Sequence, residues 1–253
     1  MNKKPVIFID SGIGGLSTLA TALSFLNFDS IYFADTRFAP YGTKTKKWLQ
    51  TRLKDIVFKL SETIKPHCIV LACNTATTNT ISNLRRCFPG IHFIGTEPAL
   101  TLAKKLGFKR PMLIATPQTI KSIKTHSANL VSLPNLATNI ETYITSRSYL
   151  SLYNILKDVF YIKTISKPCD CLILGCTHYV LIKDLISKYI SIPIIDGNEG
   201  VSKQIALIVN NKTIWQNLTI PTIKFVFSSK DSIKHEKYKK ILKQILAKPI
   251  KLC

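Results

Sequence analysis

Acidic residues are scarce in this 253-residue sequence, which has 14 Asp and Glu against 35 Lys and Arg and a formal net charge of +21. Long apolar runs are also missing, because none approaches the roughly 20 residues that a membrane-spanning helix needs. The start of the chain is basic, but its apolar stretch is short and ends at Asp10, unlike a secretory signal. These absences argue against a membrane protein and predict a cytoplasmic location.

The excess of positive charge has two possible meanings. It could mark a surface that binds nucleic acid or an anionic membrane. However, the lysines are scattered instead of grouped in blocks, so we favour the simpler interpretation that they lie on solvated faces. The densest group falls in an amphipathic helix predicted near the C-terminus, with apolar positions at Tyr238, Ile241, Leu242, Ile245 and Leu246.

The seven cysteines do not indicate a disulfide framework. Their number is odd, and in the cytoplasm a thiol is more often a core residue, a metal ligand or a catalyst. Cys169, Cys171 and Cys176 could be read as a metal cluster, but an intervening strand would splay them apart, so we predict no metal. Four of the cysteines are interpreted as structural: Cys68, Cys87, Cys171 and Cys253.

Short apolar runs alternate with helix-like segments along most of the chain. Each run ends in a polar or glycine-containing turn, a pattern typical of a parallel sheet covered by helices on both faces. The runs are almost continuously hydrophobic, as buried parallel strands are. The predicted strands are 6–10, 30–35, 68–73, 92–95, 112–116, 172–176, 192–196 and 222–229.

One strand-and-turn pattern occurs twice, as CIVLACNT (68–75) and as CLILGCTH (171–178), and the two copies align without a gap. The strand at 6–10 likewise matches the strand at 112–116. We therefore predict an α/β fold with two pseudo-symmetric parallel-sheet domains and an active site in the cleft between them. The first domain would comprise residues 1–95 and the returning segment 211–253, and the second residues 96–210. The alternative is one larger doubly wound sheet.

The repeated pattern places Cys73 and Cys176 at the ends of strands and directly before helices. Helix N-termini favour a thiolate, and if the halves face each other the two thiols meet across one cleft. Asp10 ends the first strand, where a buried carboxylate needs a partner or acts as an acid or base. His178 follows Cys176 by two positions. We predict that these four residues are catalytic. The glycine-rich loop DSGIGG (10–15) matches no nucleotide-binding motif.

Five segments together resemble the motifs of the glutamate racemase family: FIDSGIGGLSTL, FADTRFAPYG, LACNTAT, GTEPAL and LGCTHYVL. They occur in the family's order between residue 6 and about residue 197. The resemblance implies a cofactor-independent isomerase that interconverts L- and D-glutamate and supplies D-glutamate for peptidoglycan synthesis. It further implies a small-molecule substrate, no cofactor, no membrane, and a homodimer or a monomer.

The resemblance also implies the roles of individual residues. Cys73 and Cys176 would be the two proton-transfer bases, serving D- and L-glutamate respectively, with Asp10 and His178 assisting the nearest thiol. Glu141 closes LPNLATNIE, a segment that matches the family pattern only loosely, and Val180 stands where the family usually has proline. The implied substrate-binding residues are Asp10, Ser11, Tyr41, Gly42, Asn74, Thr75, Thr116, Glu141, Thr177 and His178.

Two other functions are open to a sequence of this kind. A racemase of the same family acting on aspartate would use the same machinery, because residues from many loops set the pocket size. A basic nucleic-acid-binding protein would explain the charge and would bind in a salt-dependent way. The second is disfavoured because the sequence has no groove-reading motif and no interleaving of aromatic and basic residues.

Overall fold

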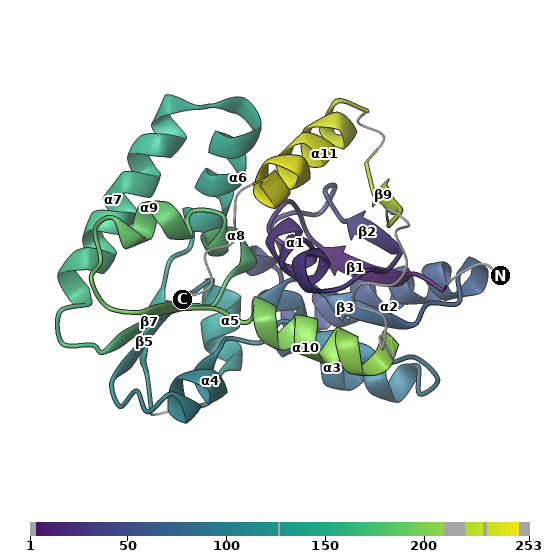
Figure 1. The fold of residues 1–253 in the computed structure, drawn as a ribbon, viewed down its shortest axis with the longest axis horizontal. Helices are drawn as coiled ribbons and strands as arrows, with labels where there is room; N and C mark the ends of the chain where they lie inside the picture. Colours follow the sequence, from purple (N-terminus) through teal and green to yellow (C-terminus); the bar gives the residue numbers. More distant parts are fainter. Residues whose placement is uncertain (1–3, 126, 210–220, 230–231, 248–253) are drawn as a thin grey trace.

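The computed structural model describes residues 4–125, 127–209, 221–229 and 232–247. Two parallel sheets, each flanked by helices, lie side by side (Figure 1). The strands are β1 (Val6–Asp10), β2 (Ser30–Ala34), β3 (Cys68–Leu71), β4 (Phe93–Gly95), β5 (Pro111–Ala115), β6 (Asn129–Ser132), β7 (Cys171–Leu174), β8 (Ile194–Ile195) and β9 (Ile223–Phe227). The helices are α1 (Leu16–Phe25), the 3-10 helix η1 (Tyr41–Thr43), α2 (Lys46–Thr63), α3 (Asn74–Cys87), α4 (Leu100–Lys105), α5 (Pro117–Ser122), α6 (Leu136–Ser146), α7 (Tyr149–Ile165), α8 (Thr177–Val180), α9 (Lys183–Ser187), α10 (Asn198–Val209) and α11 (Ser232–Ala247).

The strands of the described residues form two separate sheets. The first has the order β4-β3-β1-β2-β9 and the second the order β6-β5-β7-β8. Every neighbouring pair is parallel. The predicted α/β class with two parallel sheets is confirmed, and the alternative of a single large sheet is wrong. The domain boundaries themselves stay a prediction.

Burial explains why most strands were visible in the sequence. The central strands β1, β3, β5 and β7 are buried at every position, so each reads as an unbroken apolar run. Strand β6 was not among the strands predicted from the sequence. It lies at a sheet edge, its side chains are exposed or half-buried, and its sequence NLVS has no apolar run.

The C-terminal segment returns to the first sheet, as predicted. Strand β9 pairs in parallel with β2, and α11 packs against α1. On α11, Tyr238, Ile241 and Leu242 are buried in the core of this sheet, and Ile245 packs against it. Leu246 is 41% exposed, so its assignment to the apolar face was wrong. Residues 211–220 and 248–253, including Cys253, lie outside the described residues.

A buried ion pair holds the loop that follows β2. The Asp35 carboxylate is fully buried and accepts two hydrogen bonds from the Arg52 guanidinium of α2, at 2.7 and 2.9 Å. The Tyr41 hydroxyl of η1 donates a third hydrogen bond at 2.7 Å. Burial alone would raise the pKa of Asp35, but the hydrogen bonds from Arg52 and Tyr41 outweigh it and lower this pKa. The loop carrying Tyr41 and Gly42 is therefore anchored to α2.

We predict that Arg52→Met lowers the free energy of unfolding by about 3–5 kcal/mol, because it leaves the Asp35 carboxylate buried without its cation. Urea unfolding at pH 7 measures the loss. Since the folded-state pKa of Asp35 lies below its unfolded value, the stabilisation is present above about pH 4 and is lost as the pH falls further. The difference between the variant and the wild type should therefore shrink in acid.

The control for this prediction is Lys59→Met, on the same helix. Lys59 pairs with Asp55 at 3.2 Å, but both side chains are largely solvated, at 68% and 43% exposure. An exposed pair of this kind contributes about 0.5 kcal/mol or less. If both variants lost the same small amount of stability, the assigned role of the Asp35–Arg52 pair would be wrong.

Candidate active site

The two cysteines of the repeated pattern occupy equivalent places in the two sheets. Cys73 lies between β3 and α3, and Cys176 lies between β7 and α8. Both thiols are nearly buried, with 8% and 7% of the residue exposed. The cysteines at the strand beginnings, Cys68 and Cys171, are fully buried core residues, as predicted for structural positions.

Polar side chains join the carboxyl ends of the two sheets directly. The Thr75 hydroxyl of α3 hydrogen-bonds to Thr116 and Thr119, at 2.9 and 3.0 Å, across the junction. The Thr177 hydroxyl donates to Asp10 Oδ2 at 3.5 Å. These contacts bring strand ends from both sheets to one place, as the sequence predicted for the two halves.

Cys73 is a protonated thiol at neutral pH. Burial raises its pKa well above the ordinary thiol value, and the neighbouring charges of Asp10 and Cys176 raise it further. Backbone amides of Ala76 and Thr75, in the first turn of α3, act in the opposite direction.

Asp10 is poised to exchange a proton near neutral pH. Its carboxylate is fully buried, and Oδ1 accepts a hydrogen bond of 2.6 Å from the Gly12 amide. Burial raises its pKa to about 7, while the charge of His178 and the Gly12 hydrogen bond counteract part of that effect. A carboxyl group with this pKa can take a proton from a neighbour or return one.

His178 forms a relay between Cys176 and Glu141. Its Nδ1 lies 4.0 Å from the Cys176 sulfur, and its Nε2 lies 2.9 Å from Oε2 of Glu141. Burial would lower the pKa of His178, but its contacts with Cys176 and Glu141 outweigh this effect and raise the pKa well above the ordinary value. The raised pKa makes His178 a positively charged neighbour of Cys176. The loosely matched Glu141 is thus placed beside a predicted catalytic residue.

The DSGIGG loop has glycine where other chains come closest. A Cβ atom added to Gly12 would collide with the Glu141 carboxylate, and one added to Gly14 would collide with Nδ1 of His178. At Gly15 the added atom would lie 2.8 Å from the Ala72 side chain. Because these positions lack a side chain, the backbone of the loop can lie in direct contact with Glu141 and His178.

The remaining predicted residues lie around this cluster. Asn74 donates its side-chain amide to the Thr96 carbonyl at 2.8 Å, and Ser11 is buried directly after Asp10. Gly42 packs against Thr116, since an added Cβ would lie 3.1 Å from that side chain. Tyr41 is buried nearby, but its hydroxyl is bonded to Asp35. Substrate contacts of all these residues stay predictions.

Several residues that complete the cluster were not identified from the sequence. Thr119 bonds to both Thr75 and Thr116, and its place three residues after the N-cap Thr116 is a signal that could have revealed it. Tyr32 donates to the Gly12 carbonyl at 2.8 Å, and Tyr238 donates to Glu141 at 3.4 Å. These tyrosines lie far along the chain from their partners, so no local pattern indicates them.

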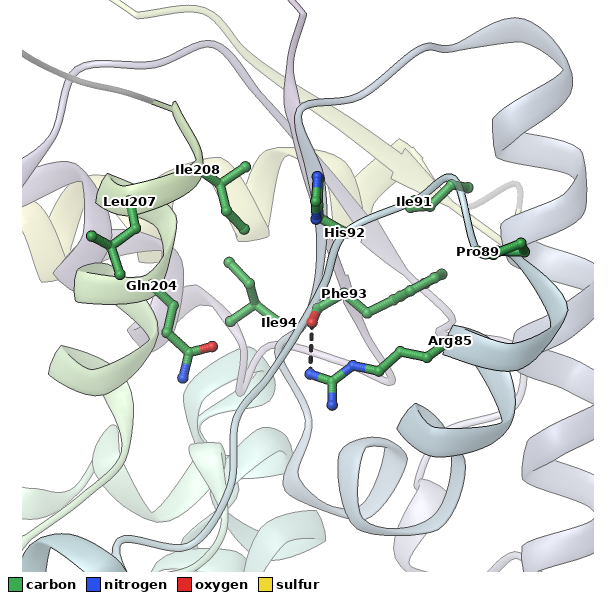
Figure 2. A pocket seen from close by; sticks show the side chains of 9 residues that line it. All are labelled: Arg85, Pro89, Ile91, His92, Phe93, Ile94, Gln204, Leu207 and Ile208. Atoms are coloured by element: carbon green, nitrogen blue, oxygen red, sulfur yellow. Dashed lines mark hydrogen bonds between the residues drawn. The ribbon is translucent and has the colours of Figure 1, made fainter.

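A separate pocket of about 400 Å³ lies at the edge of the first sheet (Figure 2). It is lined by residues around β4 and α10: Arg85, Pro89, Ile91, His92, Phe93, Ile94, Gln204, Leu207 and Ile208. The Arg85 guanidinium donates to the Phe93 carbonyl at 2.9 Å, which partly fixes one wall. None of the predicted catalytic residues lines this pocket.

Two kinds of feature are absent from the described residues. No group of three or more His, Cys, Asp or Glu side chains in them is arranged to hold a metal ion. Likewise, none of their helices has the length and apolar character needed to cross a membrane.

Comparison with known proteins identifies the family. The glutamate racemase of Clostridium novyi (strain NT) is 36% identical over an alignment of 264 positions, which covers 97% of this chain and 98% of the relative. The chain belongs to the glutamate racemase family. A second glutamate racemase, from Clostridium botulinum (strain Alaska E43 / Type E3), is 39% identical over 230 positions, or 85% of this chain. The resemblance inferred from the five motifs is confirmed. No family model matches the chain.

Solved glutamate racemases share the two-sheet fold. The enzyme of Francisella tularensis, in complex with D-glutamate, superposes with a TM-score of 0.75 at 26% identity and covers 99% of this chain. The RacE1 isoform of Bacillus anthracis superposes with a TM-score of 0.77 at 25% identity over 95% of this chain. The fold of this glutamate racemase family member is therefore that of its solved relatives.

We predict that Asp10→Asn changes how stability depends on pH. Because the pKa of Asp10 is about 7 in the folded protein and about 3.9 when unfolded, the folded state binds more protons between these values. Wild-type stability therefore falls as the pH rises from about 4 to about 7, by up to about 1.4 kcal/mol per pH unit. Asparagine cannot titrate, so the variant gains stability relative to the wild type across this window.

Urea unfolding at several pH values between 4 and 8 measures this effect. Glu62→Gln is a suitable control, because Glu62 is an exposed carboxylate on α2 and its loss should leave the pH dependence as it is in the wild type. A stability difference between Asp10→Asn and the wild type that stays constant over the whole range would contradict the raised pKa of Asp10.

Proposed function

We propose that this protein is a cofactor-independent glutamate racemase that moves the α-proton of glutamate between two cysteines. The observation that carries this proposal is the pair of buried thiols at equivalent strand ends, each with an ionisable neighbour. The charge of Asp10 acts on Cys73, and His178, which is bonded to Glu141, lies 4.0 Å from the sulfur of Cys176. A cytoplasmic enzyme of this kind would supply D-glutamate for peptidoglycan synthesis.

The stereochemistry of racemisation explains the need for two thiols. The α-proton leaves one face of the substrate, and a proton arrives on the opposite face. Two bases on opposite faces accomplish this without turning the intermediate over. One thiol must be deprotonated while the other is protonated, and each turnover exchanges these states.

The two directions of the reaction use the thiols in opposite roles. With L-glutamate as substrate, Cys176 would remove the α-proton, and Cys73, which its raised pKa keeps protonated, would donate a proton to the other face. For D-glutamate, Cys73 must first lose its proton. Asp10, with a pKa of about 7, is the neighbouring group that takes it.

The site must also stabilise a carbanion, because the α-proton of an amino acid is far less acidic than a thiol of pKa about 8.5. Hydrogen-bond donors aimed at the α-carboxylate stabilise the charge that develops there. Thr75, Thr116 and Thr177 lie around the cluster and would supply these donors. A bound substrate would replace the hydrogen bonds that the threonine hydroxyls of the two halves make to one another.

Relatives support glutamate as the substrate. The solved enzyme of Francisella tularensis holds D-glutamate, and that of Escherichia coli, which shares the fold at 22% identity, holds L-glutamate and the activator UDP-MurNAc-Ala. The net charge of +21 would draw an anionic amino acid toward the protein. Whether this chain works as a homodimer or a monomer stays open in the proposal.

We expect Cys73→Ser and Cys176→Ser each to lower the rate of racemisation by roughly 10²- to 10⁴-fold, because each removes one of two obligatory proton carriers. Circular dichroism of L- or D-glutamate without any added cofactor follows the reaction. Cys87→Ser, at the exposed end of α3, is the matched control and should retain full activity. Full activity in either of the first two variants would disprove the two-thiol mechanism.

The same variants should exchange the α-proton of only one enantiomer in deuterated water. Cys73→Ser retains Cys176 and should introduce deuterium into L-glutamate, whereas Cys176→Ser retains Cys73 and should introduce it into D-glutamate. Proton NMR of the recovered amino acid measures the exchange. Loss of the signal from the opposite enantiomer in both cases would reverse the assignment of the two faces.

A further inference from the structure

The C-terminal helix reaches the relay of the second half. Helix α11 packs against α1 beside the first sheet and lies close to α6 (Figure 1). From α11, the hydroxyl of Tyr238 donates a hydrogen bond to Oε1 of Glu141 at 3.4 Å, and the tyrosine is only 1% exposed. The contact joins the last described helix to a carboxylate beside the catalytic cluster.

Both oxygens of Glu141 are occupied in this arrangement. Oε2 holds Nε2 of His178 at 2.9 Å, and Oε1 accepts from Tyr238. The carboxylate also lies against Gly12, where no side chain could fit. A carboxylate held at both oxygens has one orientation, and that orientation sets the direction of the imidazole it binds.

We propose that Tyr238 is a positioning residue for racemisation, which fixes Glu141 so that His178 is held against Cys176. The proposal rests on the proposed function of Cys176 as a proton carrier. In this role Tyr238 acts only through Glu141 and His178.

The surroundings of Tyr238 favour a fixed hydroxyl. Its ring lies edge-on to Phe227 at 4.9 Å and contacts Tyr32 at 6.4 Å, within the core of the first sheet. Burial and the charges of Glu141 and Asp10 raise the pKa of Tyr238, so the hydroxyl stays protonated and remains a donor. The Tyr238 hydroxyl, held in place by the core of the first sheet, thus orients the Glu141 carboxylate beside the second sheet.

The contacts of Glu141 with Tyr238 and His178 connect the two halves of the molecule. Tyr238 is fixed by the core of the first sheet, while Glu141 and His178 come from α6 and α8 beside the second. The relay is fully oriented only when the two sheets lie together, as they do in this structure. Binding of substrate between them and alignment of the base are therefore coupled.

The test compares Tyr238→Phe with the wild type. The substitution keeps the ring and removes only the hydroxyl, so we expect kcat to fall roughly tenfold through misplacement of the base, with KM changed less than about twofold. Because the equilibrium constant of a racemisation is 1, kcat/KM must fall by the same factor for both enantiomers, which checks the measurement.

A second readout does not depend on activity. NMR titration follows the imidazole of His178, assigned by its absence in His178→Asn. The titratable groups that face this ring are Cys176, Glu141 and Asp10. Freed from Tyr238, Glu141 spends less time against His178, so the pKa of the imidazole should fall toward its ordinary value in Tyr238→Phe.

Ile241→Val is the matched control, because Ile241 is buried in the same core on α11 and carries no polar group. It should lose a similar small amount of stability yet keep both kcat and the pKa of His178. Equal kcat in the two variants, or a His178 pKa that is unchanged or raised in Tyr238→Phe, would overturn the positioning role. An inactive wild type would instead reject the proposed function, and the titration would still report on the contact.

Discussion

Burial of ionisable side chains between two parallel sheets is the constraint on which the rest of the structure depends. Asp10, Cys73, Cys176 and His178 are all nearly or fully removed from water, and each must find a partner there. The backbone amides of helix starts, the glycine loop and Glu141 supply these partners. The same lack of water moves the pKa values of Asp10 and Cys73 upward, toward values suited to proton exchange with a weak carbon acid.

The two halves place different ionisable residues beside their thiols. The first half gives its thiol a carboxyl partner, Asp10, from the neighbouring strand. The second half gives its thiol an imidazole, His178, that is backed by Glu141. In the proposed reaction the two thiols exchange roles between L- and D-glutamate, so each half provides its own group that can exchange a proton. Two similar sheets with different ionisable residues beside their thiols therefore suit a reaction that interconverts two enantiomers.

The strand ends could be predicted from the sequence because buried parallel strands leave unbroken apolar runs, and polar residues after them stand out. This reasoning found Asp10, Cys73, Cys176 and His178. Glu141 came only from a loosely matched motif. The edge strand β6 was missed because it is half-solvated, and Tyr32 and Tyr238 were missed because their partners lie in distant segments. Contacts of that kind follow from packing, which no local pattern records.

Strand β9 and helix α11 follow the whole second sheet in the sequence, so they are synthesised after it. The ribosome makes β2 early, but its partner strand emerges only at residues 223–227, and Tyr238 follows later still. Until then β2 has an unpaired edge and Glu141 lacks one of its two donors. A nascent chain can thus form the second sheet and four strands of the first while Glu141 still lacks the hydrogen bond from Tyr238.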